Sequence, residues 1–233
     1  GCNAVAVAYT GAAITVGDNQ ITVAGTGAAM AGTFNNTNQI NLNHVNSLIN
    51  LTDCTVSKIS QITADANSGK GIAVVSDAST ITTLTHTTSS RIALGAQLTI
   101  TNAFSIGAKT LTLSGTGVLA GGVITLDDAD SLITKLAGST GNINNALSLA
   151  NAVVLNGSKG ISSLAAFTIA GNVSFAGTSG HLRIGCNAVA VAYTGNAIDV
   201  GDNQITVAGT GGGMVGTFNN TNQINLNHVN SLI

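Results

Sequence analysis

The feature that most constrains this chain is a long internal duplication. Residues 185–233 repeat residues 1–49 at a constant offset, without insertion or deletion. Near-identity on this scale is typical of a tandem array, in which each unit packs against its neighbours. We therefore expect a window from a longer repetitive polypeptide, with residues 1–184 as one full unit of a continuous solenoid and residues 185–233 as the start of the next. The two copies differ only at Ala12/Asn196, Thr15/Asp199, Ala28/Gly212, Ala29/Gly213 and Ala31/Val215.

The composition favours a folded protein with a thin core. Hydrophobic residues make up 44% of the chain and charged residues 7%, whereas a disordered chain normally combines high net charge with low hydrophobicity. Aromatic residues account for only 3%, too few for a core built around large rings. Small and β-branched side chains suit a narrow, layered interior instead.

The charge balance limits the partners that we expect. A net charge of −2 and scattered basic residues give no field that would attract nucleic acid, so no nucleic-acid partner is expected. No uninterrupted apolar stretch is long enough for a membrane-spanning helix. A nearly neutral surface has little charge repulsion to oppose association, so we expect contacts with identical repeats or subunits, end to end and laterally.

Short runs of alternating aliphatic residues and threonine predict β-strands. Each run has one aliphatic face and one threonine face, and clusters such as Gly17-Asp18-Asn19 between runs are typical of turns. The alternation predicts which side chains form the core. The expected inward residues are Ile21, Val23, Leu98, Ile100, Leu111 and Leu113, and the expected outward residues are Thr22, Thr99 and Thr112.

Several features favour a parallel β-helix (β-solenoid) over a sandwich or barrel. A near-exact repeat needs an architecture that extends by addition, and the absence of proline suits central strands that donate every backbone hydrogen bond. The Asn-rich residues 34–39 predict amide ladders between successive rungs. We therefore predict an all-β solenoid with Gly- and Asn-rich turns. About 20 residues per rung would give about nine rungs and roughly 45 Å of axial length per unit.

A few segments do not alternate and predict single-turn helices at corners. Residues 128–138 resemble a short helix, with Asp128 or Asp130 as the N-terminal cap and Gly138 just beyond the end. Residues 44–51 and 144–152 have a similar pattern.

The densest charge in the chain is the acidic cluster Asp127, Asp128 and Asp130. The leading interpretation is structural, as turn and cap residues. The alternatives are oxygen ligands for calcium and a carboxylate pair of the kind that glycosidases use. We predict no catalytic or cofactor-binding residue and no enzymatic activity, with calcium as a weak alternative at these three residues.

The three cysteines occupy two positions of the repeat, since Cys2 and Cys186 are equivalent and Cys54 stands alone. A disulfide between Cys2 and Cys54 would have to span several layers of a solenoid, so buried thiols are favoured, and their redox state stays open. The histidines have no companions at metal-ligand spacing and are interpreted as surface or corner residues.

Parts of the chain resemble known families. Residues 97–102 (QLTITN) and 109–115 (KTLTLSG) resemble rungs of secreted bacterial β-solenoids, including autotransporter and filamentous haemagglutinin-like adhesins. Residues 56–62 (VSKISQI) and 75–81 (VSDASTI) resemble giant repetitive cell-surface proteins of prokaryotes. The resemblance is compositional, covers most of the chain and implies an extracellular, structural or adhesive role.

The leading functional prediction is a structural repeat segment of a giant extracellular protein that assembles into a fibre, sheath or surface layer. One alternative is an adhesin stalk whose binding tip lies outside this window. A remote alternative is a β-helical polysaccharide-degrading enzyme.

Overall fold

The computed structural model describes residues 5–25, 32–61, 70–163, 165–186, 190–208 and 217–233. Within these ranges the regular elements are β-strands, and none of the described residues is helical. The strands pair in parallel and stack as a β-solenoid of about eight turns, which confirms the predicted fold class.

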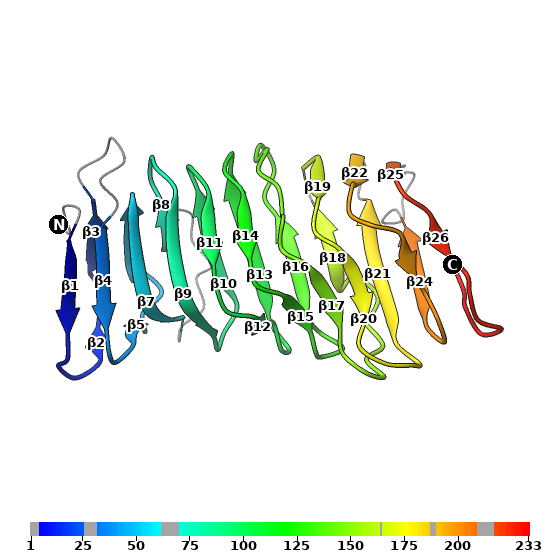
Figure 1. Ribbon diagram of the computed structural model, residues 1–233, viewed down its shortest axis with the longest axis horizontal. Coiled ribbons are helices and arrows are strands. Elements are labelled where there is room, and N and C mark those ends of the chain that lie inside the picture. The colour runs from blue at the N-terminus through cyan, green and yellow to red at the C-terminus, as the bar shows by residue number, and fades with distance from the viewer. Residues whose placement is uncertain (1–4, 26–31, 62–69, 164, 187–189, 209–216) are drawn as a thin grey trace. The chain divides into compact units, whose positions relative to one another are not determined.

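The chain divides into two compact units, of which the first comprises Gly1–Phe104 and Leu113–Gly122. One of its sheets runs in the order β1-β4-β7-β9-β11-β14, with β2 paired to β5 and β5 to β7. A second face carries β3, β6, β8 and β10 in that order (Figure 1, blue to green). The strands are β1 (Ala6–Tyr9), β2 (Ile14–Thr15), β3 (Gln20–Ala24), β4 (Gly32–Asn36), β5 (Ile40–Leu42), β6 (Leu48–Thr52), β7 (Cys54–Gln61), β8 (Gly71–Val74), β9 (Ser79–His86), β10 (Ser90–Leu94), β11 (Leu98–Ile100) and β14 (Leu119–Gly121).

The second unit comprises Ser105–Thr112 and Val123–Ile233. Its faces carry the strand orders β16-β18-β21-β24, β15-β17-β20, β19-β22-β25 and β23-β26. Its strands are β15 (Ile124–Leu126), β16 (Leu132–Lys135), β17 (Leu147–Leu149), β18 (Gly160–Ser163), β19 (Phe167–Ile169), β20 (Val173–Phe175), β21 (His181–Cys186), β22 (Ala190–Tyr193), β23 (Ile198–Asp199), β24 (Gln204–Ala208), β25 (Thr217–Asn220) and β26 (Ile224–Asn225). The short β12 (Phe104–Ser105) and β13 (Thr110–Gly115) contain points in the sequence where the units divide.

Stacking in register builds the core from like residues. In the first unit Ile21 lies opposite Ile49, which in turn lies opposite Ile72. Parallel strands in register place the same side of the pleat inward at each turn, so aliphatic columns form along the axis. The predicted orientation is confirmed: Val23, Leu98, Ile100, Leu111 and Leu113 are buried, Thr22 is exposed, and Thr99 and Thr112 are half-buried. Ile21 faces inward and is only half-buried.

One sequence unit makes a whole number of turns. Strands β3 and β24 have the same sequence and occupy the same position in the two copies of the repeat. Between them the strand order is β3-β6-β8-β10-β13-β16-β18-β21-β24, so one 184-residue sequence unit contains eight turns. The prediction of nine rungs was wrong because some corners are longer than expected. The turn that leads from Gln20 to Leu48 contains many more residues than the turn that leads from Ser79 to Leu98.

The predicted single-turn helices are also wrong. Residues 44–51, 128–138 and 144–152 contain a tight turn or bend followed by β6, β16 and β17, respectively. In the second segment Ser131 N donates to Asp128 O (3.0 Å), which begins as a helix would. The chain then extends, because Ile133 must pair with Ile161 of the next turn.

The asparagine side chains bond to the backbone of neighbouring turns. Asn36 Nδ2 donates to Lys58 O (2.7 Å), and Asn36 Oδ1 accepts from Ser57 N (3.1 Å). Asn38 Nδ2 likewise donates to Gly11 O (2.8 Å). These amides tie one turn to the next through side chain–backbone bonds, in place of the predicted stack of amides.

Candidate functional site

Many of the polar side chains gather at one type of corner. In the first copy of the repeat Gly17 has φ +61°, in the left-handed region that favours glycine. Gly17 N donates to Asn43 Oδ1 (2.9 Å), and Ser47 Oγ donates to Gly17 O (2.6 Å). Ser47 Oγ also accepts from His44 N (3.0 Å). Residues 43–47 thus satisfy both backbone groups of a glycine in the preceding turn.

The second copy of the repeat builds the same corner. Gly201 has φ +55°, and its N donates to Asn227 Oδ1 (2.8 Å). Ser231 Oγ donates to Gly201 O (2.6 Å) and accepts from His228 N (3.0 Å). The corner is therefore a property of the repeat.

The acidic cluster forms a third corner of this type. Gly107 has φ +63°; its N donates to Asp127 Oδ1 (2.7 Å), and its O accepts from Ser131 Oγ (2.7 Å). Asp128 N donates to Ser131 Oγ (3.1 Å), as His44 N does to Ser47 Oγ. Asp127, Asp128 and Asp130 thus take the places of Asn43, His44 and Asn46. Sequence reasoning missed this equivalence, although the shared spacing of NHVNS and DDADS, each preceded by a glycine one turn earlier, would have revealed it.

Each carboxylate of the cluster accepts a hydrogen bond from a different group. Asp127 accepts from Gly107, Asp128 Oδ1 accepts from Asp130 N (2.9 Å), and Asp130 Oδ1 accepts from Asn156 Nδ2 (2.9 Å). Among the residues that the structure describes, no group of three or more His, Cys, Asp or Glu side chains is placed to hold a metal ion. The geometry supports the turn interpretation, and calcium binding stays a prediction.

A Ser–His–Asp set meets at the repeated corner, and its hydrogen bonds are structural. His228 Nδ1 lies 3.6 Å from Asp202 Oδ1 and accepts from Asn230 N (3.3 Å). The Ser231 hydroxyl donates its proton to a backbone carbonyl, and its contact with His228 is to the backbone N–H. A nucleophilic serine needs the imidazole as its proton acceptor, and this arrangement does not provide it.

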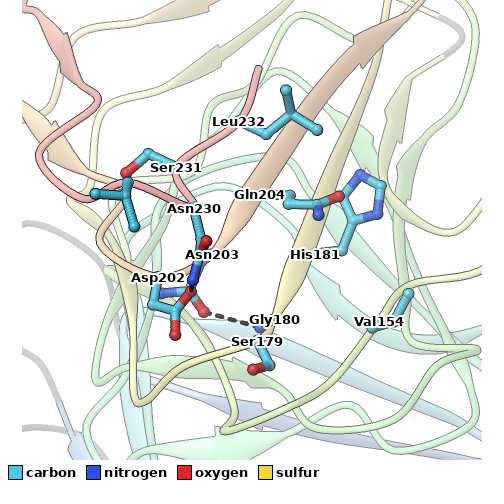
Figure 2. A pocket seen from close by; sticks show the side chains of 11 residues that line it. Val154, Ser179, Gly180, His181, Asp202, Asn203, Gln204, Asn230, Ser231 and Leu232 are labelled. Carbon is cyan, nitrogen blue, oxygen red and sulfur yellow. Dashed lines mark hydrogen bonds between the residues drawn. The ribbon is translucent and has the colours of Figure 1, made fainter.

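A groove of about 620 Å³ lies in the second unit, beside the corner that Gly201 forms with residues 227–231 (Figure 2). Its residues include one column from four successive turns, in which Val154 pairs with His181, His181 with Gln204, and Gln204 with Leu232. Val154 and Leu232 are half exposed, at 52% and 53%, so each end of this column is aliphatic. The groove is thus an elongated surface with a polar middle.

The polar middle of the groove is ordered by hydrogen bonds between turns. Asn203 Oδ1 accepts from Gly180 N (2.8 Å), the dashed bond of Figure 2, and Asn203 Nδ2 donates to Gly177 O (2.9 Å). His181 Nε2 lies 2.6 Å from Thr206 Oγ1. Burial lowers the pKa of His181, and the charge of Arg183 lowers it further, so the imidazole is neutral at pH 7.

The structure places one of the three cysteine side chains. Cys54 is buried, and its thiol donates to Val23 O (3.2 Å), which agrees with the buried-thiol interpretation. Cys2 and the side chain of Cys186 lie outside the described residues.

Lys135 is a buried charge that sequence reasoning missed. Its side chain is 1% exposed, and Nζ donates to Gly141 O (2.9 Å) and Ala166 O (2.5 Å). Loss of hydration lowers the pKa of Lys135. The signal was the alternation itself, because Lys135 follows Ile133 at a spacing of two and therefore faces inward.

No family model matches the chain, and no curated protein or solved structure matches it. In the part of the chain that the structure describes, no helix has the length and apolar character that crossing a membrane requires. The β-solenoid architecture therefore rests on the strand pairing described above.

Proposed function

We propose that this chain is a structural repeat segment of a giant extracellular β-solenoid protein that assembles into a fibre, sheath or surface layer. The observation that carries the proposal is the match between sequence and structure: one sequence unit, residues 1–184, makes eight whole turns. Consecutive units can then continue the same sheets without a change of register. Such a protein works mechanically, through parallel backbone ladders along its axis and an aliphatic core.

The differences between the two copies support a structural role for the repeat. Of the differing positions, Ala12/Asn196 and Thr15/Asp199 lie in the described residues. All four of these side chains are exposed. The core and corner residues of the two copies are identical in sequence, so the features that the repeat preserves are those that build the solenoid.

Low charge supports assembly of such segments side by side. With a net charge of −2 over 233 residues, electrostatic repulsion between neighbouring solenoids is weak. The groove along Val154, His181, Gln204 and Leu232 is an elongated surface of the kind that a parallel neighbour could contact. Extracellular location follows from the resemblance to secreted and cell-surface solenoids and belongs to the same proposal.

Electron microscopy of the producing cell tests the proposal. Antibodies raised against this chain and coupled to gold should label continuous fibres, a sheath or a layer outside the cell. Labelling of isolated projections would favour the adhesin stalk, and labelling confined to the cell interior would overturn the proposal. The purified chain should also sediment as a concentration-dependent assembly at moderate salt, whereas a monomer at every concentration would count against a fibre.

A further inference from the structure

Equivalent apolar residues of the two copies of the repeat differ in how far neighbouring turns bury them. Val7 is 38% exposed, whereas Val191, at the same repeat position, is fully buried. Ile14 and Ile21 are half-buried, whereas their counterparts Ile198 and Ile205 are 0% and 1% exposed. The first copy thus presents an open apolar edge that the second copy has covered.

The opposite side of the repeat shows the reverse pattern. Leu42 is 2% exposed and its counterpart Leu226 is 54% exposed. Ile49 is fully buried and Ile233 is 57% exposed. The repeated sequence therefore carries apolar residues on both of its sides along the axis. In each copy a neighbouring turn buries these residues on one side and leaves them exposed on the other.

The second copy identifies the segment that covers the edge. Val191 and Tyr193 of β22 lie opposite Phe167 and Ile169 of β19. In the neighbouring face Ile205 of β24 lies opposite Leu182 of β21. The covering strands are therefore β19 and β21, which lie in residues 167–184, at the end of the sequence unit, and in the first residues of the next.

The uncovered edge of the first copy contains an apolar hollow at the place where the equivalent residues of the second copy are buried. It has a volume of about 180 Å³ and is lined by Val7, Ile14, Ile21, Thr22, Val23, Phe34 and Ile40. All of these except Thr22 are apolar, and burial of apolar surface on this scale favours association. We infer that this edge is a docking surface for residues 167–184 of a second copy of the repeat unit.

Polar groups on the edge fit the same partner. Asn203 is 4% exposed and bonds to Gly177 O and Gly180 N, which lie between the covering strands, whereas its counterpart Asn19 is exposed. Tyr193 is fully buried, and its hydroxyl accepts from Val173 N (3.2 Å), whereas Tyr9 is half-buried. Asn19 and Tyr9 should therefore form the equivalent bonds with the docked residues, which gives the interface a defined register.

This inference rests on the proposed array and makes a narrower claim, since the edge can bind a second unit whether or not the whole protein forms a fibre. It is tested by the same substitution in two proteins: the chain as it stands, and an extended protein in which residues 1–184 precede that chain. In the chain as it stands Val7→Asp should lower the thermal unfolding midpoint by less than about 3 °C, and Val191→Asp by about 10 °C. The extended protein contains Val7 twice, and the substitution is made in the second of these, just after the added residues 1–184. There Val7→Asp should lower the midpoint as much as Val191→Asp does.

Two controls keep the comparison specific. Thr15→Asp should be neutral in both proteins, because Asp199 already occupies that position beside a covered edge. Val7→Thr and Val191→Thr preserve the shape of the side chain and replace the aspartate variants if those fail to fold. Their effects on the thermal unfolding midpoint should be smaller but should rank in the same order. Equal small effects of Val7→Asp in both proteins, or equal large effects in both, would overturn the inference. Failure of the fibre proposal in electron microscopy would leave this result unchanged.

Discussion

The ammonium group of Lys135 lies 5.3 Å from the centroid of the Phe167 ring, over its face. The contact joins β16 to β19, and the aromatic face offsets part of the hydration that the buried charge has lost. The other inward residue of β16, Ile133, is aliphatic. We therefore expect the stability of the second unit to depend on pH.

The first prediction concerns that dependence. Because burial lowers the pKa of Lys135 in the folded chain below its usual 10.5, the unfolded chain binds more protons between the two values. The free energy of unfolding should therefore rise with pH across that window, and Lys135→Met should abolish this contribution. Denaturant unfolding of both proteins between pH 7 and pH 11 measures the difference. Subtracting the two curves removes the opposing effect of Tyr193, whose pKa burial raises. Parallel curves would contradict the prediction.

The second prediction concerns the acidic corner. Asp127→Asn should change the free energy of unfolding by less than about 0.5 kcal/mol, because Asn43 and Asn227 make the same bond to a glycine N–H. Asp127→Ala should cost about 1–2 kcal/mol, because it leaves Gly107 N without its acceptor. Thermal unfolding with and without Ca²⁺ should be measured on both variants. A calcium-dependent midpoint that Asp127→Asn abolishes would show that the cluster binds the ion after all.

The third prediction compares two tyrosines at one repeat position. Tyr193→Phe should lower the free energy of unfolding by about 1–2 kcal/mol, because its buried hydroxyl bonds both Val173 N and Asn196 O. Tyr9→Phe should cost less than half as much, because the Tyr9 ring is only partly buried. Urea titrations of the two variants would measure both costs, and equal costs would count against the difference in environment.

The fourth prediction concerns the array. With a strand spacing of about 4.8 Å, eight turns give an axial repeat of about 38 Å, clearly shorter than the roughly 45 Å expected from nine rungs. Fibre diffraction from an oriented preparation of a multi-unit protein should show a meridional reflection near about 4.8 Å and the longer repeat. The exposed differences between units, such as Thr15/Asp199, are too small to hide it. A repeat that matches nine rungs would mean that the turns were miscounted.

Alternation predicted the strands and the core because it records a local fact, namely which side of the pleat each side chain occupies. The orientations of Leu98, Thr99 and Ile100 could be predicted from these three residues without reference to the rest of the chain. Corner length was harder to predict, because a corner can absorb several residues without moving the strands that it joins. The helical pattern of residues 128–138 was misleading for a related reason: the bond from Ser131 N to Asp128 O is local, whereas the pairing of Ile133 with Ile161 is not.

The candidate site was less predictable than the core, because its chemistry depends on contacts between turns. Asp127, Asp128 and Asp130 resemble metal ligands in sequence, and only the position of Gly107 one turn earlier shows that they form a corner. The burial of Lys135 was not predicted because residues 128–138 were interpreted as a short helix, in which a spacing of two from Ile133 does not indicate an inward position.

The match of one sequence unit to eight whole turns has a consequence for the gene. In the proposed array, recombination between misaligned repeats would delete or add complete sequence units, and each such event would remove or insert a whole number of turns. The shortened or lengthened protein keeps every strand in register, so its length can change between generations without a folding defect. If the sequence period ended partway round a turn, each exchange would join strands that belong to different faces of the solenoid, and the strand register would be lost.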